Sequence, residues 1–125
     1  MNPRLTLLVV DDEPLVRDVV CAVLRQAGFT VLEAGGGAEA EAVCRQHAGA
    51  IHLLVADVML PDANGLDLAG RLVSMRPGMK VLLMSGDIAE GGCPWLAKPF
   101  APAALVLKVR EVVAGTAQQT EGESP

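Results

Sequence analysis

The sequence predicts one α/β domain in which helices cover both faces of a parallel sheet. Residues 5–10 and 51–56 are short apolar runs without the polar alternation of a half-exposed strand, which is typical of strands buried on both faces. Between such runs lie segments whose apolar side chains recur at helical spacing. Strands that alternate with helices in this way indicate the doubly wound class.

The first half of the chain contains clear start and stop signals. Pro14 follows the strand at residues 5–10 and fits the first turn of a helix, where the N–H that proline lacks has no intrahelical partner. Gly28 is the expected stop of that helix. The next expected elements are a strand at residues 29–32, a turn at Gly35-Gly36-Gly37 and an Ala/Glu-rich helix at residues 38–47. The glycine triplet lacks a phosphate-loop pattern, so we interpret it as a flexible turn.

The second half repeats the alternation. After the strand at residues 51–56, the stretch DVMLPDANG reads as a loop by its Pro, Asn, Asp and Gly content. A helix is expected at residues 66–75, strands at 81–84 and 95–97, and a last helix from Pro102 to about residue 114. We expect one domain over residues 1–115 and a disordered polar tail at residues 116–125.

Composition argues against several classes of function. The formal net charge of −5 and the absence of Tyr disfavour a direct nucleic-acid interface, which needs basic and stacking side chains. No apolar run approaches the roughly 18 residues of a membrane span, so no membrane contact is expected. Three cysteines match no metal or disulfide spacing, which favours reduced thiols and a cytoplasmic location.

Polar side chains gather where the predicted strands end. Asp11 and Asp12 follow the first strand, Asp57 the third, Ser85 the fourth and Lys98 the fifth. In an open parallel sheet, ligands bind at the carboxyl ends of the strands, so these side chains are expected to share one edge.

Converging carboxylates are costly unless a cation neutralises them, and hard oxygen ligands suit Mg²⁺. A carboxylate can also attack phosphorus, while a hydroxyl and an ammonium hold the remaining phosphoryl oxygens. These residue types therefore suggest Mg²⁺-assisted phosphoryl transfer to an aspartate.

Four stretches, LLVVDDEP, LLVADVMLPDANG, VLLMSGD and LAKPF, resemble the signatures of the response-regulator receiver domain, in the same order. The resemblance covers about residues 5–114, and the MSGD and KPF pair is similar to receivers of hybrid histidine kinases. It implies a flavodoxin-like five-stranded sheet of order 2-1-3-4-5. It also implies a cytoplasmic two-component switch that is not an enzyme beyond the autocatalytic phosphorylation and dephosphorylation of its own aspartate.

The resemblance assigns roles to individual residues. Asp57 would be the phosphoacceptor, supplied by a histidine kinase or a histidine phosphotransfer domain. Asp12 would bind Mg²⁺ directly and Asp11 mainly through water, with Asp57 and the backbone carbonyl of Met59 as further ligands. Glu13 is expected to start the helix instead of binding metal.

Three further roles concern the fourth and fifth strands. Ser85 would be a switch hydroxyl that turns toward a phosphoryl oxygen, and Lys98 would pair with the phosphoryl group. The Lys98-Pro99 bond would be cis. Trp95 occupies the place of the family's switch aromatic, although a packing role is equally compatible with its position.

The sequence departs from the family between Ser85 and Lys98. Twelve residues separate them, and Gly91-Gly92 and Pro94 argue against much helix there. We therefore expect the fourth helix to be missing or strongly shortened, which puts the usual output surface in doubt.

Two other functions agree less well with the sequence than the phosphorylation switch does. A pseudo-receiver that acts as a phosphorylation-independent interaction or dimerisation module is disfavoured by the intact set of site residues, and homodimerisation is left open. A phosphatase of the haloacid dehalogenase type needs Asp-x-Asp, whereas Val58 and Met59 follow Asp57, so it is rejected.

Overall fold

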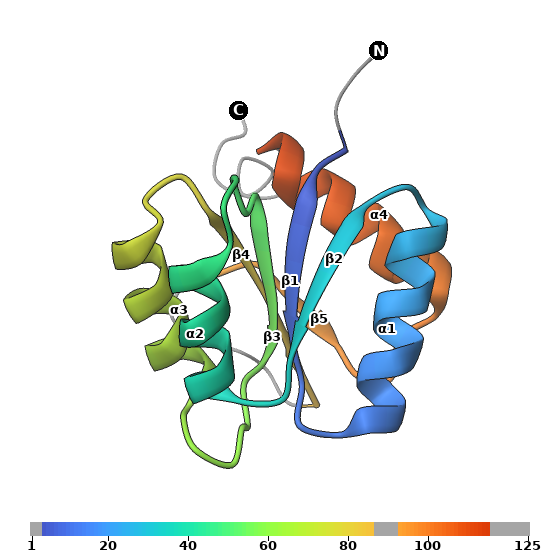
Figure 1. Cartoon of the computed structure of the whole chain (residues 1–125). Helices are drawn as coiled ribbons and strands as arrows, with labels where there is room; N and C mark the ends of the chain where they lie inside the picture. The colour runs from blue at the N-terminus through green and yellow to red at the C-terminus, as the bar shows by residue number, and fades with distance from the viewer. Residues whose placement is uncertain (1–3, 87–92, 116–125) are drawn as a thin grey trace, which may run out of the picture.

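The computed structural model describes residues 4–86 and 93–115, which form a parallel sheet between two layers of helices (Figure 1). The elements in chain order are β1 (Thr6–Val10), α1 (Pro14–Gln26), β2 (Thr30–Ala34), α2 (Gly37–Gln46), β3 (Leu53–Asp57), α3 (Gly65–Met75), β4 (Lys80–Ser85), β5 (Trp95–Ala97) and α4 (Pro102–Ala114).

The five strands pair in the order β2-β1-β3-β4-β5, and all neighbours are parallel. This confirms the predicted class and strand order. Val10 pairs with Ala56, and Asp57 pairs with Met84, so β1, β3 and β4 end at nearly the same level. Their carboxyl ends, at the bottom of Figure 1, form the edge that carries the candidate site.

The core has two halves, one on each face of the sheet. Helices α1 and α4 cover one face, and α2 and α3 cover the other (Figure 1). Successive residues of β1 alternate between them: Leu7 and Val9 pack under α1 and α4, whereas Leu8 and Val10 pack under α2 and α3. Burial on both sides explains why this strand is apolar throughout.

Local signals set the helix ends where the sequence predicts them. Pro14 opens α1, and Gly28 follows its end with a φ of 106°, a conformation that favours glycine. Gly115 ends α4 in the left-handed region with a φ of 81°. Strands β2 and β3 extend beyond their apolar runs, because the backbone pairing continues through Glu33 and Asp57.

The connection between β4 and β5 lacks the fourth helix of the family pattern in its described part. Gly86, Cys93 and Pro94 are not helical, which agrees with the prediction, while residues 87–92 and the tail 116–125 lie outside the described residues. Trp95, at the start of β5, is half-buried against the core half under α2 and α3.

Two further observations concern membrane-spanning helices and cysteines. Within residues 4–86 and 93–115, no helix is long and apolar enough to cross a membrane. Cys21 and Cys44 are free and buried on opposite faces of the sheet. Burial raises the pKa of the Cys21 thiol to about 11, with a further contribution from the charge of Glu33, so this thiol stays protonated at neutral pH.

Arg76, directly after α3, joins this helix to the end of α2. Its guanidinium donates hydrogen bonds to the backbone carbonyls of Cys44 (3.0 Å), His47 (2.6 Å) and Gly49 (2.7 Å). The last carbonyls of a helix lack intrahelical partners, and the C-terminal end of its dipole favours a cation. Arg76 therefore supplies hydrogen-bond donors to carbonyls at the end of α2, whose last residue, Gln46, lies 30 residues earlier in the chain.

We expect Arg76→Gln to lower the free energy of unfolding by about 2 kcal/mol, because charge-assisted bonds to several carbonyls are lost together. The measurement is urea denaturation followed by circular dichroism. Arg45→Gln is the matched control, since Arg45 makes an exposed ion pair with Glu41 at 3.8 Å and should change stability by less than about 0.5 kcal/mol. Equal losses in the two variants would contradict this account of Arg76.

Candidate functional site

Three carboxylates meet at the carboxyl edge of the sheet. Asp11 and Asp12 follow β1, and Asp57 is the last residue of β3. One oxygen from each lies within 4.8 Å of the others. Asp11 is fully buried and Asp57 nearly so, whereas Asp12 is exposed. Like charges this close repel one another, so the cluster has the composition of a site for a divalent cation with oxygen ligands.

Lys98 supplies a positive charge to this cluster from the end of β5. Its Nζ lies 2.6 Å from Oδ2 of Asp57 and 3.5 Å from Oδ2 of Asp11. Burial by itself would lower the pKa of Lys98, but the hydrogen bond to Asp57 and the charge of Asp11 outweigh it and raise that pKa. Lys98 therefore stays charged beside the carboxylates, although one ammonium cannot balance three acids.

Ser85 and Lys98 are tied together through the backbone. Ser85 is the buried last residue of β4, and its carbonyl accepts a hydrogen bond of 2.8 Å from the Lys98 N–H. The Lys98-Pro99 peptide bond is cis, as expected. The predicted hydroxyl and ammonium thus stand at the ends of adjacent strands. Trp95 lies three residues before Lys98 and packs on the core, so its switch role stays a prediction.

The loop after Asp57 turns back tightly on β3. The Met59 N–H donates to Oδ1 of Asp57 at 3.0 Å, and the Gly65 N–H donates to the carbonyl of Val58 at 2.7 Å. A Cβ on Gly65 would collide with the backbone carbonyl oxygen of Asp57 and lie 2.8 Å from the Cα of Val58. Glycine at this position therefore lets α3 begin directly against the carboxylate-bearing strand end. Asn64 caps the helix by accepting the Leu66 N–H at 2.7 Å.

Asp62, in the same loop, fastens it to the start of α2. Its carboxylate accepts the N–H groups of Gly37 (2.8 Å) and Ala38 (3.1 Å), and these two bonds lower the pKa of Asp62. A Cβ on Gly36 would lie 3.1 Å from this carboxylate. The glycine triplet is therefore a place of close approach between two loops, whereas the sequence suggested only a flexible turn. The first N–H groups of a helix have no intrahelical acceptor. The start of α2, which has no capping side chain of its own, is the signal that an acceptor such as Asp62 comes from elsewhere.

The residues predicted from the strand ends thus lie at one edge, where the ammonium of Lys98 contacts both Asp57 and Asp11. A family model of the response regulator receiver domain matches residues 7–110, which is most of the chain. The chain belongs to this family. The receiver domain resembles, among solved structures, that of the hybrid histidine kinase CckA, with a TM-score of 0.78 and 34% identity over 86% of this chain and 98% of that one.

Curated relatives place the receiver domain in longer proteins. It is 36% identical to the probable transcriptional regulatory protein TcrX of Mycobacterium tuberculosis over 92% of this chain and 52% of that protein. It is 31% identical to the sensor kinase CckA of Brucella abortus over 86% of this chain and 12% of that protein. The chain thus spans about half or less of the length of these relatives.

The match to this family confirms three predictions made from the four signatures: the resemblance to receiver domains, the fold class and the two-component setting. Receiver domains are signalling switches, not enzymes in the ordinary sense, and they interact with histidine kinases or phosphotransfer partners. They bind Mg²⁺ at an acidic pocket, and the cluster of Asp11, Asp12 and Asp57 has the donors for it.

Two alanine substitutions within α3 test the tight turn. Gly65→Ala should lower the free energy of unfolding by about 2 kcal/mol, because the new Cβ has no room beside Asp57. Gly70→Ala is the control, since a Cβ there meets nothing within 4 Å and alanine favours the helix by about 1 kcal/mol. Thermal unfolding of both variants decides, and a Gly65→Ala protein as stable as wild type would refute the close approach.

The contact of Asp62 with α2 should depend on pH. Because the folded-state pKa of Asp62 lies below its ordinary value of 3.8, its stabilising contribution is complete above that pH and is lost as the pH falls through the lower pKa. The difference in unfolding free energy between wild type and Asp62→Ala should be constant near neutral pH and shrink below about pH 4. Urea titrations across this range measure it, and a difference that grows on acidification would contradict the assignment.

Proposed function

We propose that this chain is a two-component phosphoacceptor switch in which Asp57 receives a phosphoryl group in a Mg²⁺-dependent reaction and the domain then controls a partner. The observation that carries the proposal is the position of Asp57. Its Oδ2 lies 2.6 Å from the ammonium of Lys98, and its carboxylate also belongs to the cluster with Asp11 and Asp12. This nucleophile thus contacts a fixed cation and also belongs to a group of acids suited to a metal.

The acids are expected to hold Mg²⁺ together with the backbone carbonyl of Met59. The ion favours oxygen ligands and keeps several waters, so a site with few protein ligands is sufficient. Bound there, it would offset negative charge on the phosphoryl oxygens. The contribution of the chain is to hold three carboxylates within 4.8 Å of one another before the ion arrives.

The transfer needs a nucleophile and a group that holds the phosphoryl oxygens. A carboxylate oxygen of Asp57 would attack phosphorus and form an acyl phosphate, while the phosphorus–nitrogen bond of a phosphohistidine breaks and its electron pair returns to the imidazole. Lys98 would then exchange its contact with the carboxylate for one with a phosphoryl oxygen. Hydrolysis of the acyl phosphate by water would return Asp57 to its starting state.

The change in Lys98 offers a route from the chemistry to the rest of the domain. Lys98 and Ser85 are joined by a backbone hydrogen bond of 2.8 Å, so both strand ends would respond to the phosphoryl group. Ser85 would turn its hydroxyl inward, and Trp95 on β5 would follow. Phosphorylation would in this way shift a pre-existing equilibrium between two loop arrangements.

The donor of the phosphoryl group would be a histidine kinase or a histidine phosphotransfer domain. Exposed Leu15 and Val19 on α1 border an open pocket of about 580 Å³ that also includes Lys98 and Phe100. A donor domain seated on these apolar side chains would bring its phosphohistidine toward Asp57. We propose a cytoplasmic location, which agrees with the free thiols, and a single domain over residues 1–115.

We expect acetyl phosphate with Mg²⁺ to add one phosphoryl group to the wild-type chain and none to Asp57→Asn, because the amide is not a nucleophile toward phosphorus. Intact-mass spectrometry measures the addition, and EDTA should abolish it. Asp67→Asn is the matched control, since this exposed acid of α3 lies outside the cluster. No labelling of wild type, or equal labelling of Asp57→Asn, would favour the phosphorylation-independent interaction module.

A further inference from the structure

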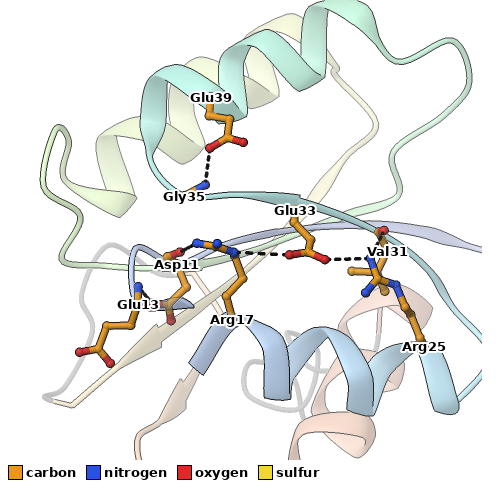
Figure 2. A network of polar contacts seen from close by, with 8 residues as sticks. All are labelled: Asp11, Glu13, Arg17, Arg25, Val31, Glu33, Gly35 and Glu39. Atoms are coloured by element: carbon orange, nitrogen blue, oxygen red, sulfur yellow. Dashed lines mark hydrogen bonds and ion pairs between the residues drawn. The ribbon is translucent and has the colours of Figure 1, made fainter. Parts of the chain in front are cut away.

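Asp11 is contacted by a polar network of α1 and β2 that takes no part in the proposed phosphorylation chemistry (Figure 2). Nη1 of Arg17 on α1 donates a hydrogen bond of 2.8 Å to the backbone carbonyl of Asp11. The Asp11 N–H donates to the carbonyl of Ala34 at 3.2 Å, and its Oδ1 accepts the Glu13 N–H at 3.0 Å. The turn between β1 and α1 is therefore fixed at both the backbone and the side chain of Asp11.

Arg17 is itself anchored through Glu33 to the edge strand β2. Its Nε lies 3.4 Å from Oε1 of Glu33, and Oε2 of the same carboxylate lies 3.1 Å from Nη2 of Arg25. Arg25 in turn donates to the carbonyl of Val31 at 3.0 Å. Figure 2 shows these groups in one line, from Arg25 through Glu33 and Arg17 to Asp11.

The burial of Arg17 indicates that these contacts stabilise the position of Asp11 and are not a solvated surface ion pair. Its side chain is 21% exposed, and its Nε is buried without an aligned hydrogen bond, so the charge of Glu33 compensates it. The planar guanidinium fork can contact the Asp11 carbonyl and Glu33 at the same time, which a lysine ammonium cannot do in the same geometry.

We infer that Arg17 is a positioning residue for the metal site, which holds Asp11 in place for Mg²⁺ through its backbone carbonyl; this inference rests on the proposed function. The charge of Arg17 alone would act in the opposite direction, because a cation beside the acids opposes the binding of a second cation. When the Arg17 side chain is neutralised, loss of positioning therefore predicts weaker Mg²⁺ binding, whereas loss of charge predicts tighter Mg²⁺ binding.

The test is the Mg²⁺ affinity of Arg17→Gln, Arg17→Lys and wild type, measured by calorimetry with MgCl₂ on the full chain. If Arg17 positions Asp11, Arg17→Gln should bind Mg²⁺ roughly tenfold more weakly, the lower end of what loss of a supporting contact costs a metal site. Arg17→Lys keeps the charge but should also bind more weakly. If charge alone matters, Arg17→Gln binds as tightly as wild type or more tightly, and the inference is overturned.

Two further variants separate positioning from general loss of stability. Arg25→Gln leaves Arg17 in place but removes a support of Glu33, so a smaller weakening in the same direction is expected. Arg76→Gln is the control, because Arg76 follows α3 and binds the end of α2, so its loss should not change the affinity for Mg²⁺. An equal weakening in Arg76→Gln would reduce Arg17 to a residue of general stability.

A measurement on metal-free protein makes the inference independent of the chemistry. The Glu13 N–H should exchange with solvent several-fold faster in Arg17→Gln than in wild type, while amides at the centre of β3 keep their relative protection. Unchanged exchange at Glu13 would overturn the inference even if Asp57 is phosphorylated. A wild type that neither binds Mg²⁺ nor accepts phosphate would instead overturn the proposed function.

Discussion

The mutual repulsion of Asp11, Asp12 and Asp57 is the constraint on which the rest of the site depends. Adjacent strands β1 and β3 bring the three carboxylates within 4.8 Å, and one ammonium, that of Lys98, lies among them. The backbone shares this task, because the N–H groups of Glu13 and Met59 donate to Asp11 and Asp57. The site thus carries net negative charge at a fixed position, and the favourable free energy of folding the sheet offsets the repulsion between the carboxylates.

The fold and the strand-end residues could be predicted because they follow from local rules. Apolar runs without polar alternation identify strands buried on both faces, and parallel pairing then brings the residues at the carboxyl ends of β1, β3, β4 and β5 to one edge. The strand boundaries were less accurate. β2 and β3 continue through Glu33 and Asp57, since backbone pairing does not require an apolar side chain.

The contacts that the sequence did not reveal join residues far apart in the chain. Arg76 binds carbonyls at the end of α2, and Asp62 binds the first N–H groups of the same helix. Arg17 on α1 reaches Glu33 on β2. A helical pattern marks such residues only as polar positions on a surface. Which backbone group they meet depends on how two elements are packed together, and that information is not local.

Trp95, the first residue of β5, can report on the state of this strand. It is the single Trp of a chain that has no Tyr, and it lies half-buried in β5, three residues before Lys98. The tryptophan emission of the whole protein therefore originates from one indole on the strand that precedes Lys98. The molecule carries a built-in optical probe of β5, so that rearrangement of this strand can be followed in real time without an attached dye.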